Sequence, residues 1–195
     1  MQFLIDNSKI DARYPELVAG QLLTPLTKYR NWSPACFAID NGAFSGFRNR
    51  CFSNVLNRQE PSKAGCLFVC VPDVVGNARR TLEIWRQRFD LVSADWPLAL
   101  VAQDGLENLE IPWPELACIF IGGTDSFKSS DAAMDIVRTA RILKKHVHIG
   151  RVNSPSRYRR FKDVAETCDG SGVSRGLGNH LQSIAGDQQQ SDLFD

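Results

Sequence analysis

The sequence predicts an α/β fold, a compact or incomplete (β/α) barrel of the TIM type. Two observations lead to this prediction. Short apolar runs alternate with amphipathic, helix-like stretches along the chain, which is typical of a parallel sheet with crossover helices. The apolar runs are also continuous rather than alternating, which indicates strands that are covered on both faces.

Seven apolar runs are expected to form strands. They are Phe3–Ile5, Ala35–Ile39, Cys66–Val71, Pro97–Ala102, Leu116–Ile121, His146–Val152 and a weaker run, Ala165–Cys168. Seven strands are one fewer than a full barrel needs, and 195 residues lie near its lower size limit of roughly 200. An open doubly wound sheet is the alternative, but no Gly-x-Gly-x-x-Gly follows the first run, so a dinucleotide site is disfavoured.

Three stretches between these runs have helical periodicity. Asn77–Leu91 places Leu82, Trp85 and Phe89 on one face. Asp131–Lys144 can be capped at its start by Ser130 or by Asp131 itself. The pair Ser154-Pro155 predicts the first turn of a third helix that runs through Val164.

Composition predicts one domain over residues 1–185 and a flexible tail over 186–195. The apolar stretch Ala64–Val75 contains Gly and Pro and is too short to span a bilayer. The start of the chain lacks the pattern of a signal peptide, so a cytoplasmic protein is expected. The six cysteines form no Cys-x-x-Cys pair and are expected to be reduced thiols, several of them in the core.

Polar residues and glycines follow most of the expected strands. In chain order these segments are Asp40–Phe44, Pro72-Asp73, Gln103–Gly105, Gly122–Thr124, Arg151–Ser154 and Cys168–Gly170. In a barrel these ends meet at one face, where the active sites of such folds lie. The sequence therefore predicts a candidate site at this face.

Five of these segments resemble, in the same order, motifs of the tRNA-guanine transglycosylase superfamily. Asp40-Asn41-Gly42-Ala43-Phe44 is similar to its Asp-Ser-Gly-Gly-Phe segment, and Val71-Pro72-Asp73 and Val101-Ala102-Gln103 are similar to its purine-reading segments. Phe120-Ile121-Gly122-Gly123 is similar to its Gly-Gly turn, and Cys168-Asp169 with Ser174-Arg175 to the segment of its nucleophile. The resemblance covers about residues 36 to 176.

The chain also departs from this pattern. Asn41 and Ala43 replace a Ser and a Gly, and Asp104 follows Gln103 where a Gly is usual. The zinc-binding Cys-x-Cys-x-x-Cys…His segment of the tRNA enzymes is missing. The short relatives that insert 7-deazaguanines into DNA in phages and bacteria are therefore the closer resemblance.

The resemblance implies a role for two carboxylates. Asp169 would attack C1′ of the sugar and hold a covalent intermediate, as carboxylates do in retaining glycosidases. Asp40 would act as general acid and base toward the departing and incoming bases. The alternatives are a simple Asp-Gly turn at Asp169 and a helix N-cap or Asx-turn at Asp40.

The resemblance also implies a base-binding set, which consists of Phe44, Asp73, Gln103, Gly122 and Gly123. Asp73 would accept hydrogen bonds from N1–H and the 2-amino group of guanine, and Gly123 would donate its N–H to O6. For Gln103 an exposed loop amide is the alternative.

Basic residues gather near the sixth and seventh strand ends, and the acidic residues are expected to lie mostly elsewhere. Those expected to bind nucleic-acid phosphates are Arg151, Arg157, Arg159, Arg160 and Arg175. A solvated helix face is the alternative. His146 and His148 alternate on one strand and are expected to share a face as structural residues, since no further metal ligand lies at usable spacing.

The expected function is the exchange of guanine for a 7-deazaguanine such as 7-cyano-7-deazaguanine in DNA, without a metal or other cofactor. A duplex base would have to be flipped out to reach the site. A tRNA enzyme and a base-removing hydrolase are the alternatives with related chemistry, and a non-catalytic nucleobase- or nucleic-acid-binding barrel is the alternative of another class. A homodimer or a partner protein is left open.

Overall fold

The computed structural model describes residues 1–6, 15–28, 31–88, 92, 95–170 and 184. The expected tail over 186–195 lies outside these residues.

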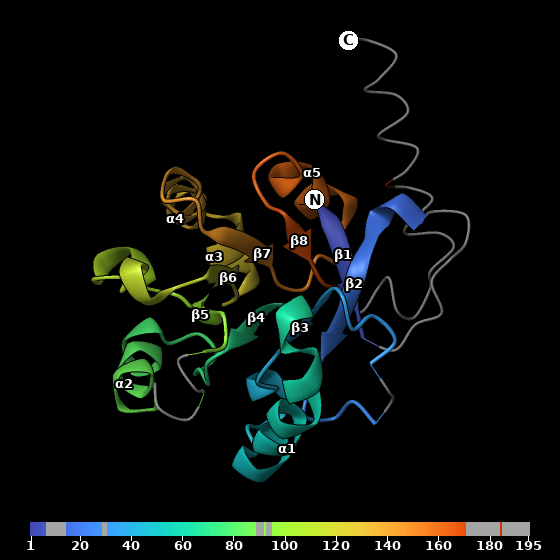
Figure 1. Ribbon diagram of the computed structural model, residues 1–195. Coiled ribbons are helices and arrows are strands. Elements are labelled where there is room, and N and C mark those ends of the chain that lie inside the picture. Colours follow the sequence, from blue (N-terminus) through green and yellow to red (C-terminus); the bar gives the residue numbers. More distant parts are fainter. Residues whose placement is uncertain (7–14, 29–30, 89–91, 93–94, 171–183, 185–195) are drawn as a thin grey trace.

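Eight parallel strands form a closed barrel, as Figure 1 shows. The strands are β1 (Gln2–Ile5), β2 (Val18–Leu23), β3 (Phe37–Ile39), β4 (Cys66–Cys70), β5 (Leu98–Ala102), β6 (Cys118–Ile121), β7 (His146–Ile149) and β8 (Thr167–Cys168). Each strand pairs with the next one in the chain, and β8 closes the ring on β1 through Phe3 opposite Cys168. The barrel prediction is confirmed, and the barrel is complete rather than one strand short.

The strand that sequence analysis missed is β2. Its sequence, Val-Ala-Gly-Gln-Leu-Leu, contains a single β-branched residue and is interrupted by Gly20 and Gln21. The close packing of β2 on β3 explains the glycine, because a Cβ atom at Gly20 would lie 2.0 Å from the carbonyl oxygen of Cys36. Gly20, which makes this segment hard to recognise as a strand, is thus required for the close packing of β2 on β3.

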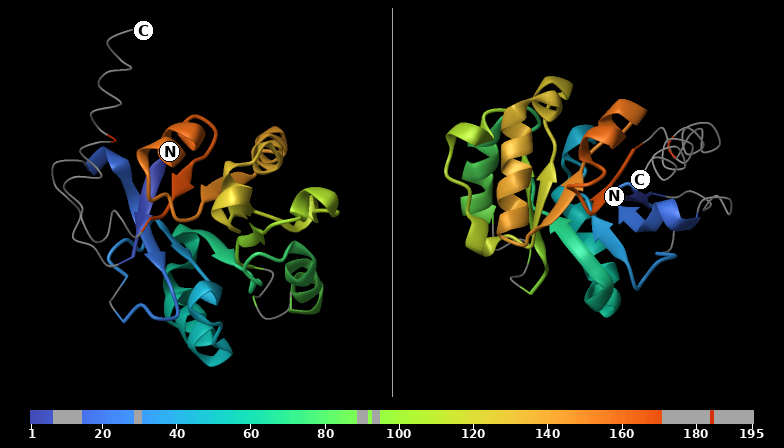
Figure 2. Two further views of the ribbon diagram at one scale, coloured as in Figure 1. Left: turned by 180° about the vertical axis from the view of Figure 1, so that it is seen from behind. Right: turned by 90° about the horizontal axis from the view of Figure 1, so that it is seen from above.

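Helices lie outside the ring of strands (Figure 2). They are α1 (Asn49–Gln59), α2 (Ala78–Arg88), α3 (Asp125–Ser129), α4 (Asp131–Ile142) and α5 (Pro155–Phe161). Short 3₁₀ turns are η1 (Pro15–Leu17), η2 (Ala43–Ser45), η3 (Glu60–Gly65), η5 (Leu106–Asn108) and η6 (Trp113–Glu115). The helices α1 and α3 were not expected from the sequence.

The predicted caps are confirmed, but two helix ends are not. The Ser130 hydroxyl accepts from the N–H of Ala133, and the Ser154 hydroxyl accepts from the N–H of Arg157. Helix α4 ends at Ile142 rather than at Lys144, because Lys144 adopts a left-handed conformation with φ 55°. Helix α5 ends at Phe161, earlier than the predicted Val164.

The core has two layers. The larger cluster lies between the outward faces of the strands and the helices. A second cluster fills the barrel interior and consists of Leu4, Leu22, Ala38, Phe68, Cys70, Ala99, Val101, Cys118 and Phe120. All six cysteines are free, and three of them are buried in these layers, in accord with the prediction of reduced thiols. The strand ends above the inner cluster are where side chains can line an open cavity.

Candidate active site

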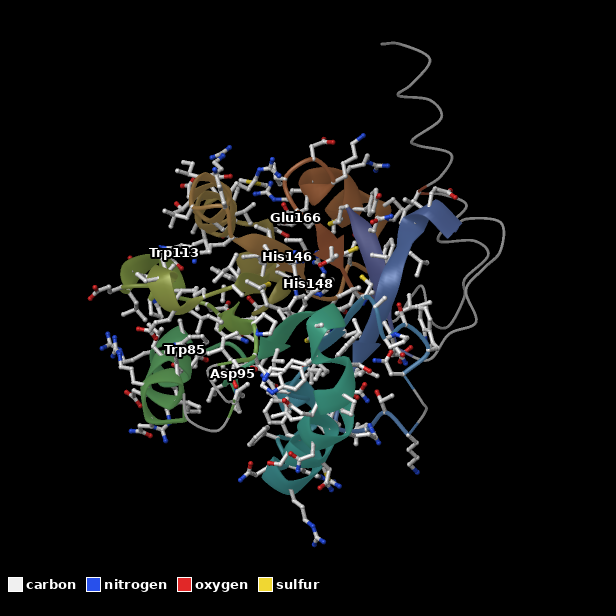
Figure 3. The ribbon with its side chains drawn as sticks, viewed as in Figure 1. Trp85, Asp95, Trp113, His146, His148 and Glu166 are labelled. Atoms are coloured by element: carbon white, nitrogen blue, oxygen red, sulfur yellow. The ribbon has the colours of Figure 1, made fainter. Side chains whose placement is uncertain are left out.

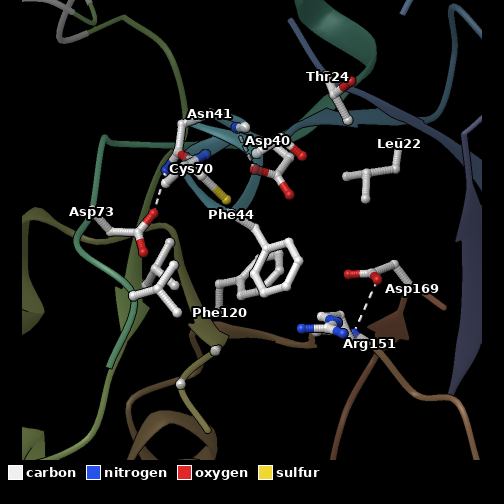
Figure 4. Close-up of a pocket in the computed structure, with 18 of the residues that line it drawn as sticks. Leu22, Thr24, Asp40, Asn41, Phe44, Cys70, Asp73, Phe120, Arg151 and Asp169 are labelled. Atoms are coloured by element: carbon white, nitrogen blue, oxygen red, sulfur yellow. Dashed lines mark hydrogen bonds between the residues drawn. The ribbon is translucent and has the colours of Figure 1, made fainter. Parts of the chain in front are cut away.

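One cavity of about 470 Å³ opens at the carboxyl ends of the strands. Eight of the residues that sequence analysis singled out line it: Asp40, Phe44, Asp73, Gln103, Gly122, Gly123, Arg151 and Asp169. They come from loops after β3, β4, β5, β6, β7 and β8, so residues up to 129 positions apart in the chain share one site. Figure 4 shows the carboxyl groups of Asp40 and Asp169 directed into this cavity, with the Phe44 ring near them.

Asp169 is held at both carboxylate oxygens. Its Oδ1 accepts a hydrogen bond from the backbone N–H of Arg151 at 3.0 Å, and its Oδ2 lies 3.1 Å from Nε2 of His148. The side chain remains 16% exposed, so a ligand in the cavity can reach it. A partner at each oxygen fixes the direction of the carboxyl group. Asp169 thus has the surroundings of a carboxylate that can attack a substrate.

Asp40 lies in a different environment. Its Oδ1 accepts one hydrogen bond, from the N–H of Gly42 at 2.8 Å. Burial raises the pKa of Asp40 to about 7; the bond from Gly42 opposes this shift, and the nearby charges of Asp169 and Asp73 add to it. A carboxyl group with a pKa near 7 can both donate and accept a proton at neutral pH.

Asp73 belongs to a hydrogen-bonded network with two amides. Nδ2 of Asn41 donates to Oδ1 of Asp73 at 2.7 Å, and Nε2 of Gln103 donates to Oδ2 at 2.6 Å. Oε1 of Gln103 accepts from the N–H of Gly76, so this amide is not the free loop side chain that was the alternative. Burial raises the pKa of Asp73, although both amide hydrogen bonds lower it. The network fixes the orientation of Asp73 and Gln103 before any ligand binds.

Asn41, where the resembling family has a Ser, is the hub of that network. Besides the bond to Asp73, its Nδ2 donates to the carbonyl of Val71 and its Oδ1 accepts from the N–H of Ala43. The side chain is 1% exposed, so all three bonds are shielded from water. In the sequence Asn41 is only a departure from the family pattern, and nothing in the motif indicates this role.

The Gly122-Gly123 turn needs glycine at both positions. A Cβ atom at Gly122 would lie 2.7 Å from Cγ1 of Val101, and Gly123 has φ +73°. Asp104, the other departure from the family pattern, accepts from both the N–H and the hydroxyl of Thr124. Asp104 therefore braces the turn after β6 and does not line the cavity.

Among the predicted phosphate ligands that the structure describes, Arg151 is the one that lines the cavity. It adopts a left-handed conformation with φ 58°, which lets its N–H reach Asp169. Its guanidinium group lies 4.1 Å from the centre of the Phe44 ring, within cation–π range. Phe44 itself is 67% exposed at the mouth. Arg151 and Phe44 thus meet across the entrance of the site.

Two of the other predicted phosphate ligands, Arg157 and Arg160, are paired with acidic residues. Arg157 pairs with Asp125 at 3.0 Å and donates to the carbonyl of Arg151, and Arg160 pairs with Asp131 at 3.5 Å. The expectation that acidic residues lie mostly elsewhere is therefore wrong for this face. Arg159 is exposed on α5, and Arg175 lies outside the described residues.

Two further side chains of the site were missed as functional candidates. Lys128 lines the cavity although its side chain is only 2% exposed, and its Nζ donates to the carbonyl of Gly123 at 3.1 Å. Burial lowers its pKa, which the charge of Asp125 partly offsets. His148 was expected to be structural but contacts Asp169. No sequence motif indicates a role for Lys128. For His148, the one signal in the sequence is its alternation with His146, which places both residues on the same face of β7.

No family model matches the chain, and a search of the curated proteins returns no significant match. Within the described ranges, no helix combines the length and apolarity needed to cross a membrane. No group of three or more His, Cys, Asp or Glu side chains in the same part of the chain is arranged to hold a metal ion.

Proposed function

We propose that the protein is a guanine transglycosylase-like enzyme that exchanges guanine for a 7-deazaguanine base in DNA. The observation that carries the proposal is the pair of carboxyl groups in one cavity. Asp169 has a hydrogen-bond partner at each carboxyl oxygen, while Asp40 has a pKa raised to about 7. Two carboxyls with such different surroundings suit the two roles of nucleophile and general acid/base.

The first half of the reaction forms a covalent intermediate. A carboxylate oxygen of Asp169 attacks C1′ of the sugar as the bond from C1′ to N9 of guanine breaks. The electron pair of that bond goes to guanine, and the proton of Asp40 neutralises the departing base. The product is an ester between Asp169 and the sugar, with ionised Asp40 beside it.

The second half reverses these steps with another base. Asp40 takes a proton from the five-membered ring of the incoming 7-deazaguanine, whose nitrogen then attacks C1′. The ester bond breaks, and Asp169 returns to the carboxylate form. Asp73 and Gln103 would hold the edge of the base in both halves, since a carboxylate accepts from N1–H and the 2-amino group.

DNA is the proposed polymer because the short DNA-modifying relatives are the closer resemblance in motif content. A flipped-out nucleotide would place its base in the cavity. Phe44 offers an exposed ring for stacking at the entrance, and Arg151 offers a charge for a phosphate.

An exchange assay tests the proposal. The protein is incubated with guanine-containing duplex DNA, single-stranded DNA or tRNA and labelled 7-cyano-7-deazaguanine, and the nucleosides are analysed by mass spectrometry. We expect label in DNA with the wild-type protein and a loss of at least about 1,000-fold in Asp169→Asn. Asp135→Asn is the matched control, because Asp135 is an exposed carboxylate on α4.

Other outcomes assign the protein differently. Label in tRNA alone would make it a tRNA enzyme, and abasic sugars without label would make it a hydrolase. Tight binding of the base with no product in any polymer would favour a non-catalytic binding barrel.

A further inference from the structure

A continuous chain of hydrogen bonds runs inside the barrel to the proposed nucleophile. Nε2 of His146 lies 2.7 Å from Oγ1 of Thr167, which lies 2.9 Å from Nδ1 of His148. Nε2 of His148 then lies 3.1 Å from Oδ2 of Asp169. Figure 3 shows both histidines near the centre of the barrel. The prediction that they share a face of β7 is confirmed.

Most of the side chains in this hydrogen-bonded chain are shielded from water. His148 is 0% exposed and Thr167 is 4% exposed. The imidazole of His148 lies between two aromatic rings, with centroid distances of 4.5 Å to Phe120 and 5.0 Å to Phe68. The two ends of the hydrogen-bonded chain, His146 and Asp169, are partly exposed. The polar atoms of these side chains therefore depend on each other for hydrogen bonds.

The donor and acceptor properties of these side chains determine the direction of each hydrogen bond between them. An ionised carboxylate only accepts, so the bond to Asp169 needs a proton on Nε2 of His148. If His148 is neutral, its Nδ1 is an acceptor and takes the single hydroxyl proton of Thr167. The Thr167 oxygen can then accept from Nε2 of His146. Burial lowers the pKa of His146 to about 4, so this ring is neutral at pH 7 and has one proton to donate.

We propose that Thr167 and His148, supported by His146, are positioning residues that hold Asp169 in the orientation required for attack. The hydroxyl of Thr167 selects the tautomer of His148 that carries its proton on Nε2. This inference rests on the proposed role of Asp169 as the nucleophile.

The consequence for Asp169 is a carboxylate that cannot rotate freely. The N–H of Arg151 holds one oxygen and His148 holds the other. A nucleophile fixed in this way starts closer to the geometry of attack. The same bond from His148 would stabilise the negative charge that returns to Asp169 when the ester breaks in the second half of the reaction.

The first test needs no substrate and so is independent of the proposed function. The protein has three histidines, so the ¹⁵N NMR signals of its labelled imidazoles are simple to assign. We expect His146 to be neutral at pH 7 with its proton on Nε2, and His148 to carry a proton on Nε2 while its Nδ1 accepts from Thr167. Thr167→Val should remove the tautomer preference of His148, and Thr167→Ser, which keeps the hydroxyl, should retain it.

The second test measures exchange with the same pair of variants. We expect Thr167→Val to lower kcat by about 10- to 100-fold with little change in KM, as is usual when a supporting partner of a reactive group is lost. Thr167→Ser should restore most of the rate. Thermal unfolding of both variants shows whether the fold is kept.

Specific results would overturn the inference. A proton on Nδ1 alone, or on both nitrogens of His148, would show that Thr167 does not set its tautomer. Equal tautomer populations and rates in Thr167→Val and wild type would exclude a positioning role. If the wild-type protein has no exchange activity, the proposed function fails, while the NMR measurement still decides whether the directed chain exists.

Discussion

The two walls of the cavity are built by different means. On the wall formed by the ends of β3, β4 and β5, side chains hold one another, with Asn41 and Gln103 both bonded to Asp73. On the wall formed by the ends of β6, β7 and β8, the backbone does most of the positioning. Gly123 and Arg151 adopt positive φ angles of 73° and 58°, and the N–H of Arg151 orients Asp169.

This difference determines how each wall can be damaged. The first wall should be sensitive to changes of polar side chains, because each buried amide there has several partners. The second wall should be sensitive to added Cβ atoms, because its turns have no room for them. At Gly170, for example, a Cβ atom would lie 2.5 Å from the carbonyl oxygen of Val152.

On the first wall, the largest effect is expected from Asp40→Asn. The variant keeps the shape of the side chain but cannot exchange a proton, so we expect the rate of base exchange to fall by about 100- to 10,000-fold. The wild-type rate should change with pH near 7, because burial raises the pKa of Asp40 to about 7. Steady-state exchange assays across this range measure both effects, and a rate within a few-fold of wild type would remove Asp40 from the chemistry.

A pair of glycines tests the second wall. Gly123 and Gly76 have nearly equal φ angles, 73° and 74°, but a Cβ atom at Gly123 would lie 2.6 Å from Oδ2 of Asp104, whereas one at Gly76 would meet nothing within 4 Å. Both alanine variants should lose about 1–2 kcal/mol of stability from backbone strain. Only Gly123→Ala should also weaken the binding of 7-cyano-7-deazaguanine, by about 10-fold or more, because the turn that presents its N–H must shift. A Cβ atom at Gly76 displaces no neighbour, so the Gly76 N–H can keep its hydrogen bond to Oε1 of Gln103.

Calorimetric titration of the base and thermal unfolding measure these two quantities. Equal affinity in Gly123→Ala and Gly76→Ala would show that the turn after β6 does not contact the base.

The smallest expected effect is a dependence of stability on pH. The folded pKa of Asp40 is raised from 3.8 to about 7, so neutral Asp40 adds stability below about pH 4, and this contribution is lost as the pH rises through about 7. Asp40→Asn removes this ionisation. Its melting temperature relative to wild type should therefore rise by a few °C from about pH 4 to about pH 8. If the difference in melting temperature between Asp40→Asn and wild type is constant across this range, folding does not raise the pKa of Asp40.

Much of the site could be predicted because strand ends are visible in the sequence. Asp40, Asp73, Gln103 and Asp169 each follow an apolar run, and a parallel barrel brings such ends to one face. The partners of these residues could not be predicted. Asn41 was a departure from the family pattern and Lys128 was not singled out at all, because long-range hydrogen bonds and burial leave no local signal in the sequence.

The basic cluster shows the opposite error. Basic residues were identified near the sixth strand end, but Arg157 and Arg160 pair with Asp125 and Asp131, which lie on α3 and α4. These ion pairs could not be predicted, because their residues lie far apart in the sequence and are brought together by the packing of the helices around the barrel.

The sequence by itself determined the alternation of strands and helices, because apolar periodicity reflects which faces must be buried. It also determined which polar residues and glycines follow the strands. Tertiary structure decided the closure of the barrel through β2, a strand with too few β-branched residues to be recognised alone. It also decided the environments that separate Asp40 from Asp169, since burial and hydrogen bonding of a carboxyl group depend on atoms that distant segments contribute.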